Sequence, residues 1–179
     1  MMKSCSFKTL IIVAMVALLV LPIAACAPKA PPPPPAGTLT VEPAKIDQAM
    51  LQGNLMRIMI LPVKFKGTGW QPNEIVTVDL VVPPDVEMKG LDRARGEDSV
   101  GIAYAAANDK GDFEVTLETV AKVDWLLRGS YLPTLTLDTK SLGNPLPNGT
   151  YTLRAVGEDT RSVATTTWDL QLVAPPVKK

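Results

Sequence analysis

Hydrophobic and polar residues follow two different patterns along this chain. Apolar residues run without a break from Leu10 to Leu21, whereas from Leu39 onward they alternate with polar residues over short stretches that end in Gly, Pro or Asn. Alternation with a period of two is typical of a half-buried β-strand, and Gly, Pro and Asn are typical of the turns between strands. The pattern therefore predicts a β-rich domain behind an apolar N-terminal segment.

The alternating stretches predict the strands of this domain. In one of them, Val63 and Phe65 lie on one face and Lys64 and Lys66 on the other, and Pro62 predicts a bulge or a sheet edge. The predicted strands are 37–43, 57–67, 74–82, 100–107, 112–118, 150–157 and 162–173. The stretch 131–138 is compatible with a further strand.

Short turns join two pairs of these strands. The first pair, 100–107 and 112–118, flanks "NDKG", in which Gly111 can supply the positive φ of a tight turn. The second pair, at the end of the chain, flanks "EDTR". We therefore predict a hairpin at each place.

Helical spacing occurs in two stretches, 44–52 and 119–129, of which the second ends at Gly129. Many short strands with so few helical residues predict an all-β fold, an antiparallel β-sandwich with one or two short helical insertions. We predict one such domain over 38–174, followed by a C-terminal tail over 175–179.

The N-terminal segment has the order of charge and hydrophobicity of a secretory signal. Lys3 and Lys8 precede the apolar run, and the small residues Ala24 and Ala25 follow it. The alternative is a permanent transmembrane anchor. It is disfavoured because a span needs about 20 apolar residues and Pro22 interrupts a helix here.

The motif "IAAC", residues 23–26, resembles the lipobox of bacterial lipoproteins. The resemblance implies a signal peptide over 1–25, cleavage between Ala25 and Cys26, and acyl chains such as palmitate on Cys26. It also implies a lipid-anchored protein at the extracytoplasmic face of the cell membrane or outer membrane. The alternative is a soluble secreted protein in which this cysteine is incidental. The other cysteine, Cys5, lies in the segment to be removed, so no disulfide framework is predicted.

The segment 26–37 is a proline-rich spacer. Its "APKAPPPPPAG" is typical of a polyproline II conformation, which extends by ~3.1 Å per residue. A spacer of this length is on the order of 30 Å long. It would lift the folded domain away from a membrane.

Composition excludes several classes of function. The chain has 18 Lys and Arg against 18 Asp and Glu, and removal of the signal leaves it mildly acidic, so we expect no nucleic-acid partner. It has no histidine, the commonest general base and metal ligand. We predict no enzyme, no cofactor and no metal site. The enzymatic alternative is a histidine-independent hydrolase using a Ser–Lys pair or paired carboxylates.

Three stretches resemble the immunoglobulin-like modules of bacterial surface proteins. They are "FKGTGWQPNEIVTV" from residue 65, "ANDKGDFEVTL" from residue 107 and "LPNGTYTLRAVG" from residue 146. The resemblance implies an immunoglobulin-like β-sandwich and carries no enzymatic activity with it.

The chain is longer than this family pattern at 44–58, 84–99 and 119–147, and insertions on a rigid sandwich are natural carriers of specificity. Trp125 is offset from the apolar stripe of the third insertion, whereas Trp70 and Trp168 lie where a sandwich needs core residues. The predicted partner contacts are Trp125, Asp92, Arg93, Arg95, Glu97 and Asp98.

Two other motifs are assigned to turns. The "NDKGD" stretch from Asn108 lacks the ligand spacing of a calcium loop, and the glycosylation sequon at Asn148 lies in a bacterial-type sequence.

Together, these observations predict a non-catalytic interaction or structural module at the cell envelope. The alternative is an accessory subunit of a membrane-bound envelope complex. The predicted partners are membrane lipid, through acylated Cys26, and an unknown envelope protein or surface polymer.

Overall fold

The computed structural model describes residues 37–134, 136–138, 141–142 and 144–173. The predicted signal peptide, Cys26 and all of the spacer but Gly37 lie outside the described residues, as does the tail over 175–179. The predictions made for those segments therefore stay predictions.

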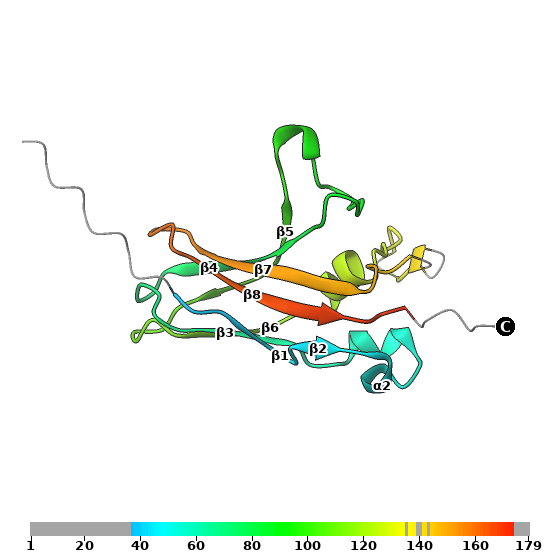
Figure 1. Ribbon diagram of the computed structural model, residues 1–179, viewed down its shortest axis with the longest axis horizontal. Coiled ribbons are helices and arrows are strands. Elements are labelled where there is room, and N and C mark those ends of the chain that lie inside the picture. The colour runs from blue at the N-terminus through cyan, green and yellow to red at the C-terminus, as the bar shows by residue number, and fades with distance from the viewer. Residues whose placement is uncertain (1–36, 135, 139–140, 143, 174–179) are drawn as a thin grey trace, which may run out of the picture. The chain divides into compact units, whose positions relative to one another are not determined.

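Within the described residues, eight strands form two sheets, which Figure 1 shows as two layers. The three-stranded sheet has the order β1 (Thr40–Glu42), β3 (Lys64–Gly67), β6 (Phe113–Thr116). The five-stranded sheet has the order β2 (Lys45–Ile46), β8 (Val163–Leu170), β7 (Gly149–Gly157), β4 (Ile75–Val81), β5 (Ser99–Ala106). All neighbours are antiparallel except β2 and β8, which are parallel. The all-β prediction is confirmed.

The core lies between the two sheets and is built by the predicted alternation. On β4, Val76, Val78 and Leu80 are fully buried while the residues between them face outward. Trp168 of β8 meets Phe65 of β3 edge to face, with ring centroids 6.1 Å apart. The prediction that Val63 and Phe65 share one face is confirmed because both side chains are fully buried. Trp70 and Trp168 are core residues, as predicted.

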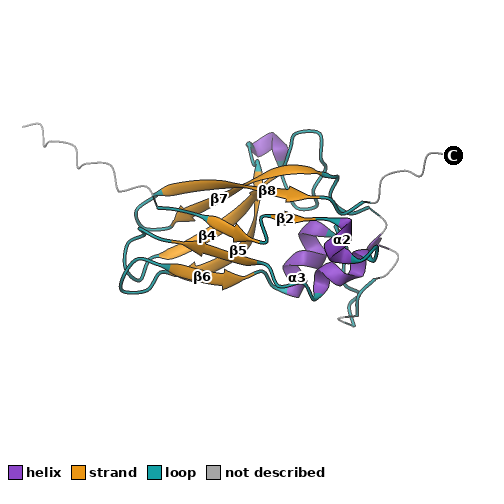
Figure 2. Ribbon diagram, turned by 60° about the horizontal axis from the view of Figure 1, so that its bottom comes forward, coloured by secondary structure: helices purple, strands orange, loops and turns teal. Residues whose placement is uncertain are grey.

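The helical segments are short, and Figure 2 shows α2 and α3 at one end of the two sheets. The helical stretch predicted over 119–129 is confirmed as a helical turn that continues in π-helical form. The stretch predicted over 44–52 is helical only over Gln48–Leu51, because Lys45–Ile46 forms a strand. The segments are α2 (Gln48–Leu51), η2 (Leu55–Met59), η3 (Arg93–Arg95), α3 (Thr119–Ala121) and η4 (Lys122–Leu126).

The hairpin predicted between 100–107 and 112–118 is wrong. β5 pairs with β4 and β6 pairs with β3, so the connection between them crosses from one sheet to the other. The turn itself has the predicted character, because Gly111 has φ 79°. Alternation predicts that a strand has a buried face but does not say which strand it pairs with.

The strand predicted over 57–67 begins only at Lys64, so its first part is wrong. Asn54 caps a 3₁₀ helix there by accepting a hydrogen bond from the backbone N–H of Met56, and Ile58 of that helix is fully buried. Among the described residues of 131–138, the pairing is a single bridge between Tyr131 and Leu137. The short strand β2 was not predicted.

Candidate functional site

β5 is an edge strand of the five-stranded sheet, and its backbone leaves hydrogen-bonding groups free. The N–H of Ala107, just after β5, donates to the carbonyl of Glu74, just before β4. Along an antiparallel strand, successive residues direct their N–H and C=O groups to opposite sides. The backbone groups of Ala103 and Ala105 therefore point to β4, and those of Tyr104 and Ala106 point to the free side.

β6 is the corresponding edge of the three-stranded sheet. The N–H of Leu117 donates to the carbonyl of Val63, beside β3. By the same alternation, the backbone groups of Glu114 and Thr116 point away from β3. Both free edges lie on the same side of the two sheets, because the crossing turn over 107–112 joins β5 directly to β6. The two sheets are therefore not joined by hydrogen bonds between β5 and β6 on that side.

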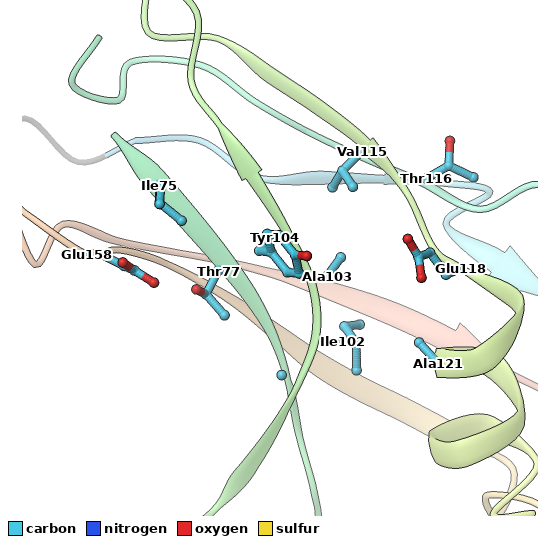
Figure 3. A pocket seen from close by; sticks show the side chains of 11 residues that line it. Ile75, Thr77, Ile102, Ala103, Tyr104, Val115, Thr116, Glu118, Ala121 and Glu158 are labelled. Carbon is cyan, nitrogen blue, oxygen red and sulfur yellow. The ribbon is translucent and has the colours of Figure 1, made fainter. Parts of the chain in front are cut away.

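A groove of about 580 Å³ follows this side of the two sheets, and Figure 3 shows the side chains around it. Small residues create the space, because Gly101, Ala103 and Ala121 stand where larger side chains would fill it. Its lining residues are Ile75, Thr77, Gly101, Ile102, Ala103, Tyr104, Val115, Thr116, Glu118, Ala121 and Glu158. These come from both sheets, α3 and the β7–β8 turn, so the groove passes around the free edge of β5.

Tyr104 is 77% exposed and is the most exposed large apolar residue of the groove lining. It lies opposite Thr77 of β4, which in turn lies opposite Val156 of β7. Val156 lies opposite Val163 of β8, which is 47% exposed. The outer face of the five-stranded sheet therefore carries a row of apolar side chains across four strands, interrupted only by Thr77. This row begins at the groove.

The groove is acidic. Glu118 and Glu158 both line it, neither forms an ion pair within the described part of the chain, and none of the described lining residues is cationic. A second hollow of about 450 Å³ adjoins it, because Thr77 and Glu158 line both. The second hollow adds Asp79 and Asp159, and one cation, Arg161.

Arg154 already forms ion pairs with two carboxylates, those of Asp98 and Asp79. Its Nη2 lies 2.9 Å from Oδ1 of Asp98 and 3.6 Å from Oδ2 of Asp79. The hydrogen bond from Arg154 lowers the pKa of Asp98, while burial raises the pKa of Asp79 against the opposing attraction of Arg154. One guanidinium thus interacts with two carboxylates, those of Asp98 and Asp79.

The predicted contact residues of the loop over 84–99 lie elsewhere, on a loop that projects from the two layers in Figure 1. Arg93 donates to the backbone carbonyls of Val82, Pro83 and Val86 and so closes the loop on its own base. Three of the remaining charged residues make contacts within the loop. Asp92 accepts a hydrogen bond from the N–H of Ala94 and forms an ion pair with Arg95, and Glu97 accepts a hydrogen bond from the N–H of Asp92. Asp98 connects the loop to the sheet through its ion pair with Arg154.

Trp125, the aromatic residue predicted to contact a partner, is partly buried against the core. It lines a smaller hollow of about 310 Å³ together with Lys89, Asp124 and Tyr131. Trp125 and the charged loop are absent from the groove lining, so the structure does not bring them together with Tyr104.

Sequence analysis missed Tyr104, Glu118 and Glu158. A signal was present in "GIAYAAA", residues 101–107, because small residues are unusual in a strand and a lone tyrosine stands among them. Glu118 and Glu158 had no such signal, since both follow strands in stretches that look like ordinary polar turns.

The other motifs behave as turns. Asn108 accepts hydrogen bonds from the N–H groups of Lys110 and Asp112, and the Asn148 amide both donates to and accepts from the backbone of Val173.

Within the described ranges, no three His, Cys, Asp or Glu side chains are grouped closely enough to hold a metal ion. None of the helices in those ranges is long and apolar enough to cross a membrane.

Comparison with known proteins gave no family model that matches this chain and no curated protein that matches it significantly.

Proposed function

We propose that this protein is a lipid-anchored binding module of the bacterial cell envelope, and that its groove at the open side of the sandwich holds the partner. It acts without catalysis. The observation that carries this proposal is the combination, in one place, of a hollow of about 580 Å³, two strand edges and two carboxylates, with the edges and the carboxylates unpaired among the described residues. Concave sites lined by apolar side chains with a few polar groups are the usual form of a binding site.

We also propose that the fold is immunoglobulin-like. The first strand region is divided between the sheets, since β1 pairs with β3 and β2 runs parallel to β8. Tyr151, near the start of the penultimate strand, donates its hydroxyl to the carbonyl of Pro147 at 2.7 Å. A tyrosine with this contact at this corner is a hallmark of immunoglobulin-like sandwiches. Both observations support the proposed topology.

The anchor follows from the sequence of the N-terminus. The lipobox-like "IAAC" supplies the acylated Cys26, and the proline-rich spacer holds the domain on the order of 30 Å from the lipid. A module held in this way meets partners at the membrane surface, which raises their effective concentration at the groove.

Site-directed photo-crosslinking in native membranes tests this function. A photoreactive residue replaces Tyr104 in the full-length protein, and a matched control replaces Glu87, an exposed residue of the projecting loop. We expect adducts from position 104 and none from position 87. An equal adduct pattern at both positions, or none at 104, would overturn the groove as the binding site.

The alternative of an accessory subunit makes a different prediction for the same membranes. A subunit of a stable complex co-isolates with its partners in fixed stoichiometry after gentle detergent extraction, whereas a module with a transient partner does not.

A further inference from the structure

We propose that the groove accepts an extended peptide segment of another protein, with alternating apolar and basic residues, that pairs with the free edge of β5. This inference rests on the proposed function, because it takes the groove as the binding site and names its occupant. It goes further by assigning the backbone of β5, and not a set of side chains, as the main recognition element.

The backbone of β5 is ready for such pairing. The N–H and C=O groups of Tyr104 and Ala106 point to the free side, as derived from the hydrogen bond between Ala107 and Glu74. Unpaired edge groups of this kind form a template for an added strand, a common mode of peptide recognition. The register of β5 on β4 shifts between Val78 and Asp79, so the uninterrupted edge that contains Tyr104 runs only over residues 103–106. The pairing is therefore short.

The side chains around β5 suit an alternating partner. Successive side chains of an added strand point to opposite faces. On the inner face, Ala103 of β5 and Val115 of β6 both line the groove, and this apolar lining suits an apolar side chain of the partner. On the outer face, Tyr104 and Ile75 are 77% and 44% exposed and offer apolar surface to the stem of a long side chain.

The negative charge of the groove predicts a positively charged partner segment and argues against a second copy of this chain. Glu118 and Glu158 flank the groove without a cation among its described lining residues. A basic side chain would neutralise them, whereas an edge-to-edge dimer through β5 would bring two sets of these carboxylates together. Charge complementarity therefore favours a basic strand from another protein.

The direct probe is a synthetic peptide, N-acetyl Lys-Val-Lys-Val-Lys-Val amide, titrated into the full-length protein in a neutral detergent by isothermal titration calorimetry. Two control peptides separate the contributions. One carries N-methyl groups on alternate amides, which prevents strand pairing, and the other has Glu in place of Lys. We expect measurable binding of the first peptide and at least tenfold weaker binding of both controls.

Protein variants locate the contact. Ala106→Pro removes an N–H that points to the free edge and leaves the hydrogen bonds to β4 intact, so the variant should fold. We expect it to weaken peptide binding about tenfold or more. We expect Glu118→Gln with Glu158→Gln to weaken binding about tenfold and to flatten its salt dependence. Glu87→Gln is the matched control and should change neither.

Each result decides the proposal. Absence of peptide binding, or equal binding of the N-methylated peptide, would overturn strand pairing; because that comparison uses the unaltered protein, it holds even if Ala106→Pro fails to fold. A concentration-dependent dimer abolished by Ala106→Pro would overturn it in favour of a second copy. Adducts at position 104 in membranes without peptide binding would refute the strand but leave the proposed function standing.

Discussion

Thr160 donates two hydrogen bonds to the same carboxylate oxygen of Glu74, from its backbone N–H and from its hydroxyl, each 2.7 Å long. Glu74 precedes β4 and Thr160 lies in the turn between β7 and β8, so this contact joins two turns that are 86 residues apart. The other carboxylate oxygen accepts from the N–H of Gln71. The side chain is only 1% exposed and crosses directly over Gly157, where a Cβ would lie 2.3 Å from it.

The first prediction concerns the pH dependence that Glu74 confers. Burial alone would raise its pKa, but the hydrogen bonds from Thr160 and Gln71 hold it below the ordinary value of 4.5. A depressed carboxyl pKa contributes stability that is present above pH 4.5 and is lost as the pH falls through the folded-state pKa. We expect Glu74→Gln to lower the free energy of unfolding at pH 7 by about 1.5–3 kcal/mol, the range for hydrogen bonds to a charged group.

Thermal unfolding of the wild type and Glu74→Gln between pH 3 and pH 7 measures this effect. The difference between the two proteins should shrink below pH 4.5, the ordinary value of the carboxyl. Glu87→Gln is the control, because Glu87 is exposed on the projecting loop. A difference that stays constant over the whole range would contradict the role assigned to the ionised carboxylate.

The second prediction concerns Gly111, whose hydrogen bond from Trp70 holds the turn between β5 and β6. A Cβ at Gly111 would lie 2.1 Å from the carbonyl oxygen of Trp70, and the residue has φ 79°. Gly90 has a similar φ of 83° with nothing within 4 Å of a Cβ. Gly90→Ala should therefore cost only the ~1–2 kcal/mol of a left-handed backbone. Gly111→Ala should cost ~1–3 kcal/mol more.

Chemical denaturation followed by tryptophan fluorescence gives both values. The difference between the two losses of unfolding free energy gives the cost of the steric clash with Trp70, because both variants carry the same cost of a left-handed backbone. Equal destabilisation by Gly111→Ala and Gly90→Ala would show that Trp70 moves aside at no cost.

The sequence predicted which faces of the strands are buried better than it predicted which strands pair with each other. Alternation was enough to place Val63 and Phe65 inside, to place Trp168 in the core and to pair the last two strands, because these features depend on residues close together in the chain. It failed for the hairpin at Gly111. Whether a tight turn returns a strand to the same sheet or crosses to the other depends on distant contacts, here those of Trp70 and Glu74.

The candidate groove escaped prediction for the same reason. Tyr104 is exposed and its backbone is free only because β5 is the last strand of its sheet, and that order is set by contacts distant in sequence. The predicted contact residues were chosen from insertions, which sequence does show. Of these, Arg93 and Asp98 hold the loop over 84–99 in place through hydrogen bonds that no local sequence pattern predicts.

The third prediction concerns Lys122 of η4, a lysine that is only 3% exposed. Its ammonium donates to the carbonyls of Leu61 at 2.6 Å and Met59 at 3.4 Å, at the end of η2, and burial lowers its pKa below 10.5. Between the lowered folded-state pKa and 10.5, the unfolded chain binds a proton that the folded chain has lost. Stability contributed by this group therefore rises with pH across that window.

A comparison with Lys122→Met tests this sign. The unfolding free energy of the wild type minus that of the variant should increase as the pH rises from neutral toward 10.5. Burial raises the pKa of the Tyr151 phenol above 10.0, but this group is present in both proteins, so its titration cancels in the difference. A difference that falls with pH would mean that the carbonyls of Met59 and Leu61 outweigh desolvation at this ammonium.

The last prediction concerns the anchor, which rests on the resemblance of "IAAC" to a lipobox. In a lipoprotein, the thiol of Cys26 is the acceptor of the lipid and Cys26 becomes the first residue of the mature chain. Two or more acyl chains give stable membrane attachment, whereas one gives only marginal attachment. We expect the wild type to enter the detergent phase on phase separation and its intact mass to show acyl chains on a chain that begins at Cys26. Cys26→Ala should abolish both, while Cys5→Ala, a change in the segment to be removed, should leave both intact; an unmodified wild-type chain in the aqueous phase would refute the anchor.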